Sequence, residues 1–291
     1  MWARHAFSSG IFAAVASGTN IFHIGSTQAK RIPLLLPPLA GQRRIVDLIS
    51  AVDTEADEAE AASTQAHHAL DAVADGLTAQ VNCRLGERVT IGSGPSWEAA
   101  QEVGAPVDGA LPVIGITNTL PDGRLDMSNP RHVVGLSRSV TVLSPSSLLM
   151  IRTNGNRNRI GNVYRVGPQA VGCAFSAFQI GLHPHDPSDA PYLYWHLRSP
   201  RVQGRISEAA SGTTGLGNIA VRWLRELPIH WPSVAVRTAF VETSEALHAV
   251  AEAGAELARA LARLRAALSA DLLSGNHEIP DPYDVLLESA S

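Results

Sequence analysis

The chain has 291 residues, of which 45% are hydrophobic and 17% are charged, and its formal net charge at pH 7 is −4. This composition is that of an ordinary globular protein with one large or two modest domains. No run approaches the roughly 18 apolar residues that a membrane-spanning helix needs, and no signal-peptide pattern follows the apolar stretch 11–16. Cys83 and Cys173 lie in no disulfide-type or zinc-type cluster. We therefore expect a cytoplasmic protein with free thiols and no membrane contact.

The charged residues are distributed unevenly along the chain. Residues 1–39 carry a net charge of +3, residues 40–80 of −6, residues 81–233 of +4 and residues 234–291 of −5. A DNA backbone requires positive charge at the contact rather than a positive average. The charge pattern therefore permits a nucleic-acid role without requiring one.

The first predicted element is a long helix within residues 37–80. It begins after Pro37-Pro38 and contains no proline from there onward. Small and apolar residues recur at alternating spacings of four and three, as in a heptad seam: Ile45, Ile49, Val52, Ala56, Ala59, Ser63, Ala66, Leu70, Val73 and Leu77. About 40 helical residues make a rod of roughly 60 Å, and a rod of this length needs a second helix to cover its apolar stripe.

Residues 81–232 have a different texture and predict an α+β domain. Short β-like runs alternate with glycine, proline and asparagine at 88–91, 111–116, 139–143, 148–152, 163–166 and 175–182. One helix is predicted over 190–199, continuing through 202–210.

A second long helix is predicted within residues 233–275, followed by a polar tail over 276–291. Shifting the first seam by 195 positions gives Phe240, Ser244, Leu247, Ala251, Gly254, Ala258, Leu261, Arg265, Leu268 and Leu272. Only Ser244 and Arg265 break the apolar pattern. The middles of both seams are small, which lets two helix axes approach closely. We expect an antiparallel coiled coil; the alternative is two independent amphipathic helices, each packed on its own domain.

The repeat extends upstream of both helices. Ala16-Ser17-Gly18-Thr19 precedes the first helix, and Ala210-Ser211-Gly212-Thr213 precedes the second. The chain is therefore a half-repeat with a unit of about 195 residues, and the first copy holds only its last 36 or so residues before the helix.

These motifs, in this order, resemble the specificity subunits of type I restriction-modification systems. Pro37-Pro38-Leu39-Ala40-Gly41-Gln42 is similar to the start of the family's conserved helix. The other similar stretches belong to its target recognition domain: Leu85-Gly86-Glu87, Pro112-Val113-Ile114-Gly115-Ile116-Thr117-Asn118, Leu148-Leu149-Met150-Ile151-Arg152-Thr153, Ile160-Gly161-Asn162-Val163, Tyr192-Leu193-Tyr194-Trp195-His196-Leu197-Arg198-Ser199-Pro200, and Ser211-Gly212-Thr213-Thr214-Gly215 followed by Asn218-Ile219, Leu224 and Leu227-Pro228.

The resemblance implies a fold for this chain and assigns the catalytic chemistry to partner subunits. The fold would be α+β: a target recognition domain with a mixed, highly curved β-sheet, plus two long helices in an antiparallel coiled coil. Residues 1–36 would be the C-terminal remnant of a first recognition domain, 37–80 the central helix, 81–232 a complete recognition domain and 233–275 the distal helix. The chain would bind double-stranded DNA and methyltransferase subunits, and a restriction endonuclease subunit could join. S-adenosylmethionine, ATP and magnesium would belong to those partners.

The chain departs from the family pattern in two places. The first recognition domain is represented only by its tail, as in a truncated gene product, a fragment, or a half-subunit that self-associates. Arg237 stands where the second helix should carry the counterpart of Gln42, and Pro232-Ser233 replaces the proline pair. An alternative function is therefore a coiled-coil module that binds the modification subunit without reading a full site.

The candidate DNA contacts are polar loops. The densest holds Arg152, Asn154, Asn156, Arg157, Asn158 and Arg159. Arginine can pair with guanine and asparagine with adenine in the major groove, although the same loop could be a solvated hairpin turn. Ser211, Thr213 and Thr214 could bind phosphate or form a structural turn. Arg138 is a weaker candidate, as are Arg124 and Arg131.

No constellation of catalytic residues is recognised. No glycine-rich S-adenosylmethionine loop accompanies Asp281-Pro282-Tyr283, which only partly echoes a methyltransferase box. His67-His68 and His183-Pro184-His185 have no cysteine or carboxylate at metal-site spacing along the sequence. We expect no catalytic residue, no metal site and no cofactor in this chain.

Overall fold

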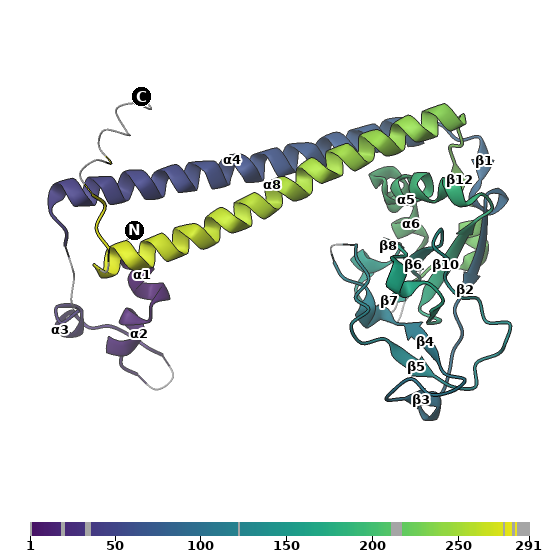
Figure 1. The fold of residues 1–291 in the computed structure, drawn as a ribbon, viewed down its shortest axis with the longest axis horizontal. Coiled ribbons are helices and arrows are strands. Elements are labelled where there is room, and N and C mark those ends of the chain that lie inside the picture. The colour runs from purple at the N-terminus through teal and green to yellow at the C-terminus, as the bar shows by residue number, and fades with distance from the viewer. Residues whose placement is uncertain are drawn as a thin grey trace. The chain divides into compact units, whose positions relative to one another are not determined.

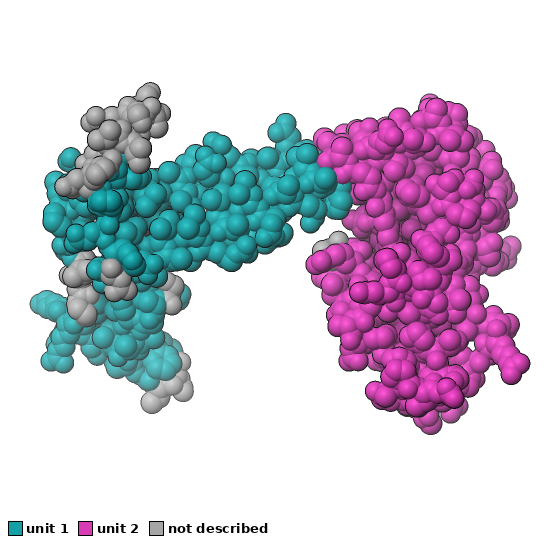
Figure 2. Space-filling view, viewed as in Figure 1, with its two compact units in different colours: residues 1–67, 248–291 teal, residues 68–247 magenta. Residues whose placement is uncertain are grey.

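The computed structural model describes residues 2–18, 21–32, 36–121, 123–210, 217–275, 277–280 and 283. They form two compact units, of which unit 1 comprises residues 1–67 and 248–291 and unit 2 comprises residues 68–247 (Figure 2). The two long helices, α4 Leu39–Thr78 and α8 Val234–Ser274, each contribute to both units (Figure 1). Among the described residues, no helix is long and apolar enough to cross a membrane. The finer five-part division stays a prediction.

The two long helices pack antiparallel, as the shared seam predicts (Figure 1). In unit 1, Ile45 and Ile49 of α4 form a buried cluster with Leu272 of α8. Farther along α4, the Ser63 hydroxyl donates a 2.8 Å hydrogen bond to the Ala251 carbonyl oxygen of α8. Residue numbers therefore rise along one helix as they fall along the other.

Small side chains bring the two helices close together in unit 1. A Cβ atom on Gly254 would lie 2.8 Å from the Ala59 carbonyl oxygen and 3.1 Å from the Ser63 backbone nitrogen. Ala251 is fully buried. Arg265, which interrupts the apolar seam, forms an ion pair with Asp53 of α4. The charged residue in the seam of α8 therefore links the two helices.

The predicted seam residues differ in burial. Buried are Ile45, Ile49, Val52, Leu70, Phe240 and Leu272, and half-buried are Leu77, Leu247, Leu261 and Leu268. The prediction that Val73 lies in the buried seam is wrong. Val73 is 38% exposed, whereas its neighbour Ala74 is 3% exposed. The buried stripe continues from Leu70 in four-residue steps through Ala74 to Thr78. A straight helix has 3.6 residues per turn, so its buried face drifts away from a strict heptad.

Three short helices precede α4 in unit 1: α1 Trp2–Ser8, α2 Ile11–Val15 and α3 Ser26–Ala29. Ser17 and His23 form an isolated antiparallel bridge between α2 and α3. The Gln28 side chain accepts a 2.9 Å hydrogen bond from the backbone nitrogen of Gly25 and so caps α3.

Among the described residues, all strands lie in unit 2 and form four small sheets instead of one continuous sheet. Their orders are β2-β10-β6-β8, β3-β5-β4-β9, β1-β12 and β11-β7, and the pair β4-β9 is parallel. The α+β class with mixed sheets is therefore confirmed. The strands are β1 Cys83–Arg84, β2 Val89–Ser93, β3 Glu102–Val103, β4 Leu111–Ile114, β5 Arg131–Val133, β6 Leu148–Ile151, β7 Thr153–Asn154, β8 Val163–Arg165, β9 Ala174–Phe175, β10 Gln179–Pro184, β11 Gly217–Asn218 and β12 Pro228–Ile229.

Three helices pack with these strands: α5 Ala190–Arg198, α6 Pro200–Ala209 and α7 Val221–Arg225. The predicted helix over 190–210 is divided because Ser199 has an extended ψ of 142° and Pro200 opens α6. Apolar residues of the sheet β2-β10-β6-β8, of α5 to α7 and of both long helices share one core, in which Leu70, Ala74 and Phe240 take part. The segments of α4 and α8 that belong to unit 2 are thereby part of its core.

The half-repeat reappears as equivalent contacts at the two helix starts. In α4, the Gln42 side chain donates a 2.8 Å hydrogen bond to the Pro37 carbonyl oxygen. In α8, the Arg237 guanidinium donates a 2.7 Å bond to the Pro232 carbonyl oxygen. The substitution of arginine for glutamine therefore preserves the local contact. Arg237 adds a 2.8 Å ion pair with Asp189 in unit 2.

Candidate nucleic-acid interface

The polar loop that follows β6 is held on both sides by other parts of unit 2. Its first residues form β7, which pairs with β11 so that Thr153 faces Asn218. Their side chains also share a 2.8 Å hydrogen bond. Gly217 lies close to Ile160 in this pairing, since a Cβ atom on Gly217 would lie 2.5 Å from the end of the Ile160 side chain and would displace it. The loop therefore has a defined backbone.

The three arginines of the loop bind carbonyl groups of neighbouring segments. Arg152 donates to the Ile219 carbonyl oxygen at 3.2 Å, and Arg157 donates to the Ala210 carbonyl oxygen at 3.3 Å. Arg159 donates to both the carbonyl and the hydroxyl oxygen of Thr119 at 2.7 Å. These side chains position the loop, a role that the sequence-based assignment to DNA contact did not include.

The asparagines shape the tip of the loop. The Asn154 side chain accepts a 2.8 Å hydrogen bond from the Asn156 backbone nitrogen. The Asn156 side chain accepts a 3.1 Å bond from the Asn158 backbone nitrogen and caps the 3₁₀ helix Arg157–Arg159. Asn154 is half-buried, whereas Asn156 and Asn158 are exposed. Of these three, Asn158 is the exposed side chain that the turn itself does not use.

The remaining sequence-predicted residues lie elsewhere. Arg138 is exposed in a turn that follows β5. Ser211, Thr213 and Thr214 lie outside the described residues. Whether any of these residues contacts DNA stays a prediction.

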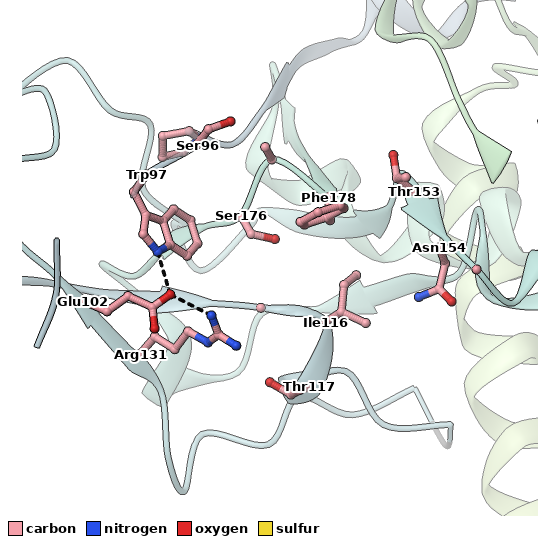
Figure 3. Close-up of a pocket in the computed structure, with 14 residues that line it drawn as sticks. Ser96, Trp97, Glu102, Ile116, Thr117, Arg131, Thr153, Asn154, Ser176 and Phe178 are labelled. Carbon is pink, nitrogen blue, oxygen red and sulfur yellow. Dashed lines mark hydrogen bonds and ion pairs between the residues drawn. The ribbon is translucent and has the colours of Figure 1, made fainter. Parts of the chain in front are cut away.

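A cavity of about 590 Å³ opens beside the loop (Figure 3). Thr153, Asn154 and Gly155 contribute to its wall, together with residues from four other stretches of unit 2: Pro95, Ser96, Trp97, Glu102, Gly115, Ile116, Thr117, Arg131, Ser176, Ala177 and Phe178. Figure 3 shows the rings of Trp97 and Phe178 on the same side of the cavity. Aromatic faces next to hydroxyl and amide groups suit a flat, hydrogen-bonding ligand.

The charged groups of this cavity neutralise one another. Glu102 accepts a 2.8 Å hydrogen bond from the Trp97 indole nitrogen and a 2.7 Å bond from Arg131 (Figure 3). The bond from Trp97 is the main reason that the pKa of Glu102 is lowered, and Arg131 acts in the same direction. The carboxylate fixes both side chains, so the cavity is a mostly apolar recess whose charged lining residues, Glu102 and Arg131, neutralise each other.

Sequence reasoning did not identify Trp97, Glu102 and Thr117 as parts of this cavity. Trp97 is half-buried, and Arg131 was only a weak candidate. The lining comes from five separate stretches of the chain. No local signal joins these residues, because Arg131 lies 29 positions after Glu102 in the sequence.

The histidines have partners that their sequence neighbours do not reveal. His183 shares a 2.9 Å hydrogen bond between its Nδ1 and the Ser147 hydroxyl, and burial lowers its pKa. His67 of α4 lies close to His248 and Glu252 of α8 in unit 1. The sequence-based search for metal ligands considered only nearby residues and did not include this group.

Comparisons with known proteins relate this architecture to solved structures. No family model and no curated protein matches the sequence at a significant level. The structure matches the S subunit of the type I restriction-modification system from M. genitalium with 16% identity and a TM-score of 0.55, covering 94% of this chain and 72% of that one. It matches the HsdS subunit from Thermoanaerobacter tengcongensis with 19% identity and a TM-score of 0.54, covering 93% and 67%.

A third match is a chain of the type I R-M system, from a structure that concerns complex assembly and conformational transition. It has 18% identity and a TM-score of 0.64, covering 94% of this chain and 69% of that one. At these identities the likeness is one of fold. Over about 94% of its length, this chain has the fold of the specificity subunits of type I restriction-modification systems.

Proposed function

We propose that the chain is a DNA-specificity subunit of a type I restriction-modification complex, and that region 81–232 reads one half of a split DNA site. The observation that carries the proposal is the braced polar loop on this fold. A loop that reads bases must hold its tip still, because each base is distinguished by hydrogen bonds of fixed direction. Arg152, Arg157 and Arg159 supply that bracing from within the loop.

Within the loop, positioning and reading belong to different residues. Arg159 positions the backbone by binding Thr119. Asn158 is exposed at the tip, and an asparagine amide can bond to two atoms of an adenine edge. Arg138 is exposed and suits contact with phosphate, which adds affinity without sequence preference.

The chemistry of the complex would belong to its partners. Methyltransferase subunits would bind this chain and carry S-adenosylmethionine, and a restriction subunit would use ATP and magnesium. This chain would supply no catalytic residue and no cofactor site for either reaction. A second recognition domain would read the other half of the site, either on the same polypeptide or on a second copy. A cytoplasmic location is part of the same proposal.

The proposal is tested by selection from a random duplex library with the complex of this chain and its methyltransferase subunit. A defined enriched motif is expected. Asn158→Ala should relax one position of that motif, whereas Arg138→Ala should weaken binding to all sequences and reduce the salt slope by about 1. Arg259→Ala is the matched control, because Arg259 lies on α8 and pairs with Glu256. Complex formation with no enriched motif would contradict the proposal and favour an interaction module.

A further inference from the structure

The two long helices bring three potential metal ligands together in unit 1. His67 lies on α4, and His248 and Glu252 lie four residues apart on α8. Residues at this spacing occupy the same face of a helix. One ligand atom from each of the three residues lies within 4.8 Å of the others. We propose that His67, His248 and Glu252 bind a divalent transition metal of the zinc class between the two helices.

The orientation of His67 fits this role. Its Nδ1 lies 3.0 Å from the Ser63 carbonyl oxygen, so Nδ1 can donate its hydrogen there and leave Nε2 as the metal-binding atom. Histidine ligands in metal sites commonly donate their second ring nitrogen to a carbonyl group in this way. Ser63 is itself bonded to Ala251 of α8. The residue that orients His67 is therefore fixed to the helix that carries the other two ligands.

The ligand set selects the class of metal. Two imidazole nitrogens and one carboxylate oxygen suit Zn²⁺ and similar ions, whereas Mg²⁺ and Ca²⁺ prefer oxygen ligands alone. In a tetrahedral zinc site, ligand atoms about 2.0–2.2 Å from the metal lie roughly 3.4 Å apart. Two of the side chains, His67 and Glu252, are exposed and can rotate to close the remaining gap. Water would complete the coordination.

The internal repeat does not place the same three ligands at the related positions. At the positions related by the shift of 195, the chain carries Ala262, Asp53 and Asp57 in place of the two histidines and the glutamate. Asp53 is already paired with Arg265. The combination of His67, His248 and Glu252 is therefore not a consequence of the repeat.

Metal binding would join the two helices through side chains. A metal that binds the folded pair and not the unfolded chain stabilises the fold, and this stabilisation grows with the logarithm of the free metal concentration once that exceeds the Kd. The ligands lie in unit 1, whereas the loop 152–159 lies in unit 2. This proposal does not depend on DNA recognition, and either can fail without the other.

The test uses the full chain, without a histidine tag and treated with a chelator, titrated with Zn²⁺ and separately with Co²⁺. Saturable binding of one ion per chain is expected, with a cobalt spectrum of tetrahedral type and a higher Tm in zinc. His67→Ala and His248→Ala should each weaken binding by more than about tenfold, since even the loss of an outer-shell partner costs tenfold or more. Both variants should keep the wild-type circular dichroism spectrum without metal.

The matched control is His68→Ala, because His68 is an exposed histidine adjacent to His67 on the same helix. This variant should bind both ions as the wild type does. Glu252→Gln keeps the shape of the side chain and should weaken binding without unfolding the helices. Absence of saturable zinc binding would overturn the proposal. Equal binding by the wild type, His67→Ala and His248→Ala would overturn it as well.

Discussion

Gly254 provides a sharp test of how closely the two long helices approach. Glycine in a helix interior is normally improved by alanine, which stabilises a helix by about 0.8–1.0 kcal/mol. At Gly254, however, the new Cβ atom would lie 2.8 Å from the Ala59 carbonyl oxygen, which belongs to the backbone of the other helix. Forcing extra volume into a packed contact costs about 1–3 kcal/mol. Gly254→Ala should therefore range from neutral to about 2 kcal/mol destabilising.

The matched control is Gly76→Ala, because Gly76 also lies in a long helix and a Cβ atom there would meet nothing within 4 Å. This variant should gain up to about 1 kcal/mol. Urea denaturation followed by circular dichroism gives both values, and an unchanged m value shows that the midpoints report stability. If Gly254→Ala stabilises the chain as much as Gly76→Ala does, the two helices do not approach as closely at Gly254 as the structure indicates.

Three further predictions concern unit 2. Arg159→Met should lower the free energy of unfolding by about 1–3 kcal/mol, because the buried Thr119 oxygens lose their donor; an unchanged urea midpoint would contradict this. Burial lowers the pKa of His196 to about 3, so the unfolded chain binds a proton there that the folded chain does not, and stability is lost as the pH falls below about 6.5. The free energy of unfolding should fall by about 2 kcal/mol between pH 7 and pH 5. Urea denaturation of His196→Gln at both pH values should show a smaller fall. The Arg237–Asp189 pair is largely buried, with side chains 13% and 12% exposed, so Arg237→Met should cost up to about 3–5 kcal/mol. Adding Asp189→Asn should recover part of that cost in a double-mutant cycle, and a purely additive loss would show that the pair is not coupled.

The long helices could be predicted because their signal is local and periodic. A seam such as Ile45, Ile49 and Val52 repeats with the helical turn, and the shift of 195 relates it to the seam of α8. The signal was less reliable where α4 enters unit 2. There the helix contacts a domain core as well as α8, so Ala74 is buried and Val73 is exposed.

Strands were predicted less reliably because a strand requires a neighbour. The alternating run 139–143 reads as a strand, but it forms none. Leu143 instead exchanges backbone hydrogen bonds with Cys173 and Gly172. The predicted strand 175–182 is divided into β9 and β10 by a turn in which the Gln179 side chain binds Ser176.

The candidate site depends on contacts between distant segments, which local patterns do not contain. The loop 152–159 was identified from its composition, but its arginines were assigned to DNA contact. Their carbonyl partners, such as Ile219 and Thr119, are far away in the sequence. The cavity beside the loop and the group formed by His67, His248 and Glu252 likewise require the folded chain.

The most direct test of the proposed DNA specificity is sequencing of methylated sites after this chain is expressed with the methyltransferase subunit proposed as its partner. We expect methylation confined to a defined split motif, with one half of the motif relaxed at a single position by Asn158→Ala. Arg259→Ala should leave the motif unchanged. A stable complex that methylates DNA without a defined motif would contradict the proposed function. A motif that Asn158→Ala leaves intact in both halves would contradict the proposed role of the loop 152–159.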